Sequence, residues 1–187
     1  MSLKDRWLPI LVLAFAVTLA AAAQQSAPSA ANAGTSAGKA KAGVNAALAS
    51  AAKEFVAQGC DDSLWTHVYR SKRLAVVEKC ISVTGTILNV KKEADGDDFI
   101  QLQLDAQYAK LLNSKNKSAQ AGALIVEAIC QNAVTQSNAV QACRDYHSAV
   151  EVPSGGSHVK VLGSYVLDSE AGSGWMEIHP VTSISPE

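Results

Sequence analysis

The fold is decided by two alternating segments, CISVTGTILNV at residues 80–90 and FIQLQLD at residues 99–105. Apolar residues alternate with polar ones in both, a period of two that predicts β-strands with one buried face. The inward positions are Ile81, Val83, Ile87, Ile100, Leu102 and Leu104. The charged connection between the segments contains Asp95-Gly96-Asp97-Asp98, a strong turn signal. Together the two segments predict a long β-hairpin.

Three further segments have strand character: ALIVEAIC at residues 123–130, HVKVLGSYVLD at residues 158–168 and WMEIHPVTSI at residues 175–184. A Gly/Ser turn at residues 172–174 joins the last two. Asp105 can cap a short helix in which Tyr108 and Leu111 share a face, and a polar loop at residues 113–120 follows. Residues 135–146 are predicted as a second helix.

This order of elements predicts a mainly β protein with short helices, of the α+β class. Five strands with a helix between the third and the fourth are typical of the oligonucleotide/oligosaccharide-binding (OB) barrel. The helix between strands 2 and 3 is then an extra insertion. The mid-strand glycines Gly85 and Gly163 suit the sharp coiling of a small barrel. The alternative topology is an open five-stranded sheet with helices on one face.

The N-terminal region divides by composition into three parts. Residues 1–23 carry Lys4 and Arg6, then an apolar run that ends Ala-Ala-Ala, which predicts a secretory signal peptide cleaved after Ala23. A retained anchor is the alternative, but the run is shorter than the roughly 20 apolar residues that cross a bilayer. Residues 24–43 predict a flexible Ala/Ser/Gly tether, residues 44–59 a short helix that docks on the domain, and residues 60–187 the OB-like barrel domain.

All four cysteines lie beyond the predicted signal peptide, which indicates two disulfides in an oxidising periplasmic or extracellular space. Three pairings are possible, and nearest neighbours in sequence favour Cys60–Cys80 with Cys130–Cys143. No two cysteines have the short spacing of a structural zinc knuckle. No transmembrane segment is expected once the signal peptide has been removed.

The charge balance weighs against general attraction to nucleic acid. From Phe55 onward the chain has 11 basic and 15 acidic residues, a balance of −4. Long-range electrostatics would therefore oppose the approach of a polyanion, and non-specific nucleic-acid binding is disfavoured.

The last strand carries the most specific candidate site. Alternation places Trp175, Glu177 and His179 on one face, and Asp168 closes the preceding strand across a short turn. A carboxylate and an imidazole on one side of a strand can share a divalent cation or transfer a proton. Alternatively, Glu177 and His179 hydrogen-bond each other on a solvated barrel face, with Trp175 covering the barrel end.

Two weaker candidates precede it in the chain. Asp95 and Asp97 could offer oxygen ligands to Mg²⁺ or Ca²⁺, although an Asp-Gly turn is common in hairpins on geometry alone. Trp65, His67 and Tyr69 alternate beside a basic patch and could form a stacking surface for a polyanion. Their structural alternative is a lid that closes one barrel end.

Residues 83–87, the Asp-Gly-Asp turn, residues 158–168 and residues 174–180 together resemble a group of uncharacterised secreted bacterial proteins with OB-like barrels. The resemblance covers residues 60–184 and implies a fold without an activity. Residues 85–90 followed by Asp95-Gly96-Asp97 are also similar to the first hairpin of thermonuclease-like enzymes, whose acids serve a calcium site. That family needs further arginines, whereas here Arg144 is the only arginine after Arg73.

The sequence favours an exported, non-enzymatic OB-like binding module, whose ligand is a cation, a glycan, an oligonucleotide or another envelope protein. Its structural motifs are complete, whereas each catalytic set is partial, and the common hydrolase and phosphate-loop motifs are absent. A divalent cation, Ca²⁺ or Zn²⁺, is the cofactor to be considered. The alternative is a metal-dependent phosphodiester hydrolase that uses Asp95, Asp97, Glu177 and His179.

Overall fold

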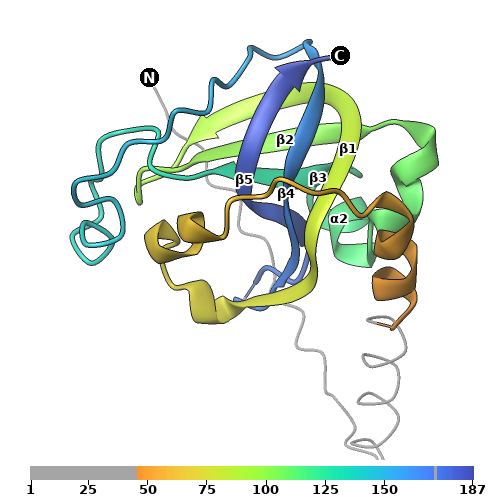
Figure 1. Cartoon of the computed structure of the whole chain (residues 1–187), viewed down its shortest axis with the longest axis horizontal. Helices are drawn as coiled ribbons and strands as arrows, with labels where there is room; N and C mark the ends of the chain where they lie inside the picture. The colour runs from red at the N-terminus through yellow and green to blue at the C-terminus, as the bar shows by residue number, and fades with distance from the viewer. Residues whose placement is uncertain (1–45, 171) are drawn as a thin grey trace, which may run out of the picture.

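The computed structural model describes residues 46–170 and 172–187 (Figure 1). The predicted signal peptide and tether lie outside the described residues, as does the start of the predicted helix at residues 44–59. Within the described part of that helix, residues 46–52 are helical and continue into the 3-10 helix η1 (Lys53–Phe55). Leu48 and Ala52 are buried, and the ring of Phe55 lies 4.7 Å from that of Tyr108, so this segment docks on the domain as expected.

Five strands form one closed sheet: β1 (Leu74–Lys92), β2 (Asp98–Leu104), β3 (Leu124–Ala128), β4 (His158–Asp168) and β5 (Met176–Pro186). Their order around the sheet is β1-β2-β3-β5-β4, and β4 pairs again with β1 (Figure 1). Every pairing is antiparallel except β3 with β5, which is parallel. The five predicted strands are all present, and the open-sheet alternative is wrong because the first strand is long enough to pair along both of its edges.

The helices are short, and two of the predictions for them are wrong. Between β2 and β3 lie the expected 3-10 helix η4 (Ala106–Leu111) and an α-helix, α2 (Ser114–Ala119), where a polar loop was predicted. Asn113 and Asn116 form a reciprocal capping box that starts α2. Residues 135–146 form a series of turns and not a helix: the N–H groups of Thr135 and Gln136 donate to the Ala94 carbonyl oxygen of the β1–β2 turn, and the bonds that follow are local turns such as Ala139 to Gln136. The α+β class holds, but the helix expected between the third and fourth strands is absent from residues 129–157, all of which the structure describes.

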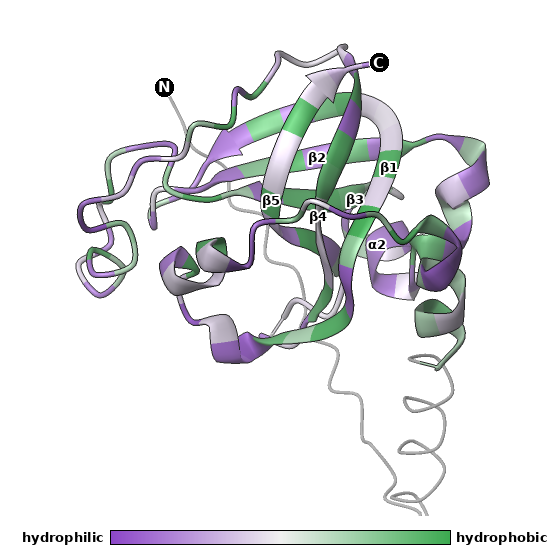
Figure 2. Cartoon of the chain, in the orientation of Figure 1, coloured by the Kyte–Doolittle hydropathy of each residue, from purple (hydrophilic) through white to green (hydrophobic). Residues whose placement is uncertain are grey.

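The apolar residues divide between the two faces of the sheet. The inner face holds the main core, to which every strand contributes, including Ile81, Ile100, Val126, Val161 and Ile178. A smaller cluster lies on the outer face and is made by Leu64, Val68, Leu74, Ile129, Cys130 and Val166. Figure 2 shows the hydrophobic stretches concentrated on the strands and hydrophilic ones on the connecting segments. The period of two thus sorts each strand between an inner and an outer core.

Segments before and after the strands cover part of the outer face. The 3-10 helices η2 (Asp62–His67) and η3 (Ser71–Arg73) precede β1, and residues 129–146 follow β3 (Figure 1). Both segments supply residues to the outer cluster, including Leu64 and Val68 from the first and Ile129 and Cys130 from the second. No helix within the described ranges is long and apolar enough to span a bilayer.

Two disulfides connect these covering segments to the rest of the chain. Cys60 is bonded to Cys80 of β1, and Cys130 to Cys143, which is the pairing that sequence proximity favoured. The first bond ties the segment that leads into η2 to β1, and the second closes the turns that follow β3. Two disulfides in a domain of this size are typical of proteins that fold in an oxidising compartment.

Two glycines permit close packing of neighbouring strands. A Cβ atom on Gly163 would lie 2.5 Å from Ile178 Cγ2 and 2.6 Å from the carbonyl oxygen of Pro180, and one on Gly85 would lie 2.3 Å from the carbonyl oxygen of Gln103. Both approaches are far inside van der Waals contact. The sheet can therefore curl shut at these points only where the side chain is missing.

We expect Gly163→Ala to lower the free energy of unfolding by about 2–3 kcal/mol, because the added methyl group overpacks the β4–β5 contact. Gly155→Ala is the matched control, since its Cβ would meet nothing closer than the Leu88 carbonyl oxygen at 3.4 Å. Urea unfolding followed by circular dichroism measures both. Equal stability of the two variants would contradict the packing argument.

Peptide mapping of unreduced protein tests the two disulfides. Trypsin has no cleavage site between Cys130 and Cys143, so the peptide spanning residues 118–144 should weigh two hydrogens less than its reduced form. The peptides spanning residues 54–70 and 80–91 should appear as one linked species. Alkylation of any of the four cysteines before reduction would contradict this connectivity.

Candidate functional site

Three polar side chains from β3 and β5 converge on the outer face of the sheet. Ile125 is the parallel partner of Glu177, and two residues further along each strand Glu127 and His179 follow on the same face. One potential ligand atom from each of Glu127, Glu177 and His179 lies within 4.8 Å of the others. Phe99 of β2 is paired with Glu127 and borders the group. The predicted common face of Glu177 and His179 is present, with a second carboxylate beside it.

This group of three is buried, although it lies on the outer face. The side chains of Glu177 and His179 are each 1% exposed, and Glu127 is 7% exposed as a residue. The solvated barrel face expected as the alternative for Glu177 and His179 is therefore wrong. Residues of η2 and of the segment after β3 pack in the outer cluster with Val166, which is the β4 partner of Glu177, so this part of the outer face is covered.

The hydrogen bonds within the group leave one nitrogen without a partner. Trp175 Nε1 donates to Glu177 Oε1 over 2.5 Å, which orients that carboxylate. His179 Nδ1 lies 3.4 Å from Glu177 Oε2, a long contact. His179 Nε2 is buried and has no hydrogen-bond partner, and it is the one such side-chain atom among the described residues. A buried polar atom left in this state costs about 1–3 kcal/mol.

A pocket of about 270 Å³ opens beside the group. It is formed by the segment before β1, the β1–β2 turn, the starts of β2 and β5, β3, and the β4–β5 connection. Its lining residues are Tyr69, Arg70, Arg73, Glu93, Asp95, Phe99, Glu127, Gln136, Asp168, Glu170, Trp175 and Glu177. The pocket thus brings Asp95, Asp168, Trp175, Glu177 and Tyr69, which the sequence suggested separately, to one place.

Ion pairs connect the two sides of this pocket. Arg73 lies with its NH1 atom 2.7 Å from Asp168 Oδ2, and both side chains are mostly buried. Arg70 lies 2.8 Å from Glu170 in a more exposed pair. Asp168 therefore serves to hold Arg73, and with a third, longer contact of 4.0 Å between Arg73 and Glu170 the segment before β1 is attached to the end of β4 and the β4–β5 connection by three guanidinium–carboxylate contacts.

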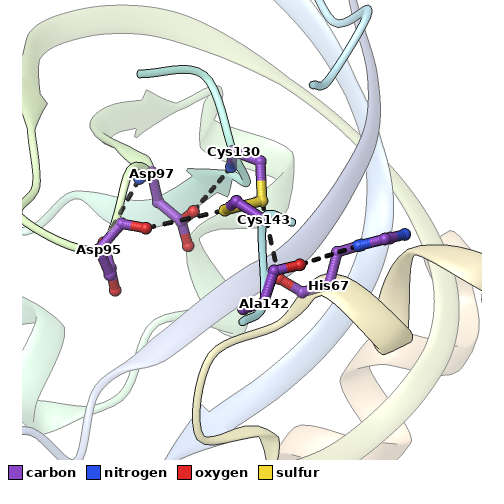
Figure 3. Close-up of a disulfide and its surroundings, with 6 residues drawn as sticks. All are labelled: His67, Asp95, Asp97, Cys130, Ala142 and Cys143. Atoms are coloured by element: carbon purple, nitrogen blue, oxygen red, sulfur yellow. Dashed lines mark hydrogen bonds between the residues drawn. A yellow bond between two sulfur atoms is a disulfide. The ribbon is translucent and has the colours of Figure 1, made fainter. Parts of the chain in front are cut away.

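The Asp95-Gly96-Asp97 turn is hydrogen-bonded to the segment that follows β3. Asp97 Oδ1 accepts the backbone N–H of Cys130 over 2.8 Å, and Asp95 Oδ1 accepts the backbone N–H of Asp97 over 3.3 Å (Figure 3). The backbone N–H of Asn132 donates to the Gly96 carbonyl oxygen over 2.8 Å. Asp97 lies near the sulfur atoms of Cys130 and Cys143, but those cysteines form a disulfide and offer no thiolate to a metal. The turn therefore anchors the segment that follows β3.

Burial dominates the electrostatics of two acids near the site. Desolvation raises the pKa of Asp97 to about 6, against the lowering effect of the neighbouring His179. Desolvation also raises the pKa of Glu127 well above its usual range, and the charges of Glu177 and Asp97 raise it further. Glu127 therefore holds a proton far more readily than an ordinary glutamate.

The predicted stacking surface is divided among three places. Trp65 lines a separate shallow pocket with Val76 and Lys79. His67 stacks on Tyr146 with ring centroids 4.0 Å apart, and its Nδ1 lies 2.9 Å from the carbonyl oxygen of Ala142 (Figure 3). Of these three residues, only Tyr69 lines the pocket beside Glu127 and Glu177, which we call the acidic pocket because six of its lining residues are Asp or Glu. Because η2 is helical, the period of two assumed for these residues does not apply.

Glu127 is not among the residues that the sequence predicts for a site, and Arg73 is predicted only as part of the basic patch beside Trp65, His67 and Tyr69. Glu127 stands alone in an apolar strand of five residues, all of them buried, and a single charge in such a run was the available signal. Arg73 precedes β1 and reaches the pocket through the β1–β4 pairing of Leu74 with Asp168. No local pattern indicates that long-range contact.

Comparisons with protein-family models, with curated proteins and with solved structures gave no match to this chain.

The raised pKa of Asp97 predicts a pH-dependent effect of Asp97→Asn. Well below pH 3.8 Asp97 is protonated in both states, and between pH 3.8 and about 6 it ionises in the unfolded chain while it stays protonated in the folded protein, so the free energy of unfolding falls over this range. Between pH 4 and pH 7 the free energy of unfolding of the wild-type protein should therefore fall by about 2–3 kcal/mol relative to that of the variant. The asparagine oxygen can still accept the Cys130 N–H.

Urea unfolding of metal-free, oxidised protein at several pH values between 4 and 7 measures this difference. Titrating groups that do not interact with Asp97 cancel in the comparison, and repeating it in a Glu127→Gln background removes the contribution of Glu127, whose pKa the Asp97 charge raises. A difference between wild type and variant that does not change with pH would contradict the shifted pKa.

Proposed function

We propose that this protein is an exported binding module, built on an OB-type barrel, that takes a cation into the acidic pocket beside β3 and β5. Five strands in the order β1-β2-β3-β5-β4, with β3 parallel to β5, support the OB assignment. OB barrels bind their ligands on strands 2 and 3 and on the loops between strands 1 and 2 and between strands 4 and 5. The pocket occupies the corresponding region, since Asp95, Phe99, Glu127 and Glu170 come from those elements.

The charge of the pocket is the observation that carries this proposal. Six carboxylates line it and only two guanidinium groups, and each guanidinium is already paired with a carboxylate of the same pocket. Even with Glu127 protonated, negative charge exceeds positive charge. Such a lining attracts a cation and repels a phosphate or a nucleic-acid strand.

Export is supported by the chemistry of the cysteines. Both disulfides fix covering segments of the outer face, and two disulfides in a domain of this size are typical of an oxidising compartment. The apolar run at residues 7–23, preceded by Lys4 and Arg6, has the pattern of the secretory signal peptide that export requires.

A metal-dependent phosphodiester hydrolase is the competing function. Arg73 lies in the same pocket as Asp95 and Glu177, an arrangement that such an enzyme could use. However, the Arg73 guanidinium is bound to Asp168, and the carboxylates of Asp95 and Asp97 accept hydrogen bonds from backbone N–H groups. A binding module accounts for these contacts without requiring a free phosphate-binding arginine.

We expect cations to raise the melting midpoint of the protein, because a ligand that binds the native state stabilises it. The probes are Ca²⁺, Zn²⁺ and spermidine, with inorganic phosphate and single-stranded DNA as the anionic arm. Glu93→Gln/Glu170→Gln should weaken cation binding about threefold to tenfold, since an exposed charge pair contributes about 0.2–1 kcal/mol. Differential scanning fluorimetry gives the shifts, and isothermal titration gives the affinities.

Glu151→Gln is the matched control, because Glu151 is exposed and lines a different pocket. It removes the same charge without touching the acidic pocket, so its cation affinity should equal that of the wild type. A protein stabilised by phosphate or single-stranded DNA and unaffected by all three cations would contradict the proposed function.

A further inference from the structure

The carboxylates and imidazole beneath the acidic pocket form a set of metal ligands. Glu127, Glu177 and His179 bring two carboxylates and one imidazole to within 4.8 Å of one another, in a region that is almost completely buried. Parallel pairing of β3 with β5 fixes their positions, because all three side chains project from two adjacent rigid strands. Ligands that are held on strands in this way are preorganised for a single ion.

A second observation distinguishes this group from an ordinary acidic cluster. His179 is 0% exposed as a residue, and its Nε2 has no hydrogen-bond partner in the described part of the chain. Its other nitrogen makes only the 3.4 Å contact with Glu177. A buried imidazole is expected to have hydrogen-bond partners, and here one ring nitrogen has none and the other has only a long contact, so the ring can offer a nitrogen to a metal ion beside the two carboxylates.

The other groups of potential ligands in the described chain are less suitable. Asp97 lies beside Cys130 and Cys143, whose sulfurs form a disulfide, and its own Oδ1 accepts the Cys130 N–H. His158 and Asp105 lie 3.1 Å apart, but both side chains are more than a third exposed and no third ligand joins them. Neither set combines burial, free donor atoms and three ligands.

We propose that Glu127, Glu177 and His179 bind one Zn²⁺ ion, an inference that deepens the proposed function and rests on it. Imidazole and carboxylate together suit zinc, whereas Ca²⁺ takes six to eight oxygen ligands. Three protein ligands leave one position of a tetrahedral zinc site for water or a small molecule. Both glutamates line the acidic pocket, so the proposed site adjoins the pocket.

The surroundings of the ligands support a zinc site. Trp175 Nε1 donates to one oxygen of Glu177, which fixes the carboxylate and leaves Oε2 directed toward His179. Hydrogen bonds of this kind to ligating carboxylates are part of how proteins orient metal ligands. Trp175 is therefore a positioning residue for Glu177 in this site.

Zinc binding to the chelator-treated, oxidised protein tests the proposal. We expect one Zn²⁺ per chain by isothermal titration and metal analysis. His179→Gln should weaken this binding at least about 100-fold, because loss of even an outer-shell partner typically costs 10–100-fold. His158→Gln is the matched control, since it removes an exposed imidazole away from the pocket and should leave the affinity unchanged.

A measurement on the unaltered chain covers the case in which His179→Gln does not fold. The protein has four histidines, and zinc should shift the ring resonances of one buried imidazole in a nitrogen-detected NMR spectrum, with the other three unchanged. Cobalt substituted for zinc should give a visible spectrum without a thiolate band, because both disulfides persist. Zinc-dependent shifts confined to exposed histidines would overturn the proposal.

The outcomes separate this inference from the proposed function. Zinc affinity that is the same in wild type, Glu127→Gln and His179→Gln would overturn the zinc site. If calcium or spermidine still binds, and Glu93→Gln/Glu170→Gln weakens it, the acidic cation pocket stands without the zinc ligands. If no cation binds the folded protein, both proposals fail.

Discussion

The parallel pairing of β3 with β5 is the constraint on which the rest of the structure depends. It joins only Ile125 with Glu177 and Val126 with Ile178, yet it closes the sheet. Because the two strands run in the same direction, alternate residues of both project to the same side in step. Apolar residues therefore enter the inner core together, and Glu127 meets Glu177 and His179 on the outer face. The strand pairing that closes the sheet therefore also brings the three polar side chains together.

Burying that polar group opposes folding, and the surrounding structure must offset the cost. Glu127 is desolvated enough to raise its pKa, and His179 Nε2 has no partner among the described residues. The apolar inner face and the disulfides provide the compensating stability, since neither needs the polar group in order to form. A local cost retained in an otherwise well-packed domain is typical of a functional site, because a purely structural protein gains nothing from it.

The segment between β3 and β4 explains why the site is covered. A disulfide closes its first part, and its backbone hydrogen-bonds to the β1–β2 turn through Gly96 and Ala94. Gly96 has a φ of +100°, and a Cβ there would lie 3.0 Å from the carbonyl oxygen of Asn132, so the turn and the segment fit only with glycine between them. The Asp-Gly-Asp motif thereby acts on the site from a distance. It holds down the segment that packs in the outer cluster with Val166, the β4 partner of Glu177.

The sequence predicted those features that depend on neighbours along the chain. The bounds of β4, the inner face of β1 and the common face of Glu177 and His179 all follow from the period of two. Features that depend on partners far along the chain were inaccessible or wrong. The segment 135–146 begins with two N–H groups, those of Thr135 and Gln136, that donate to Ala94 of a distant hairpin turn, and α2 begins where Asn116 can also donate to the carbonyl oxygens of Ala123 and Met176. Strand parity alone cannot tell a solvated outer face from a covered one. That distinction decides whether Glu177 and His179 are ordinary surface residues or metal ligands, and it rests on the contacts of η2 and the segment after β3 with the sheet.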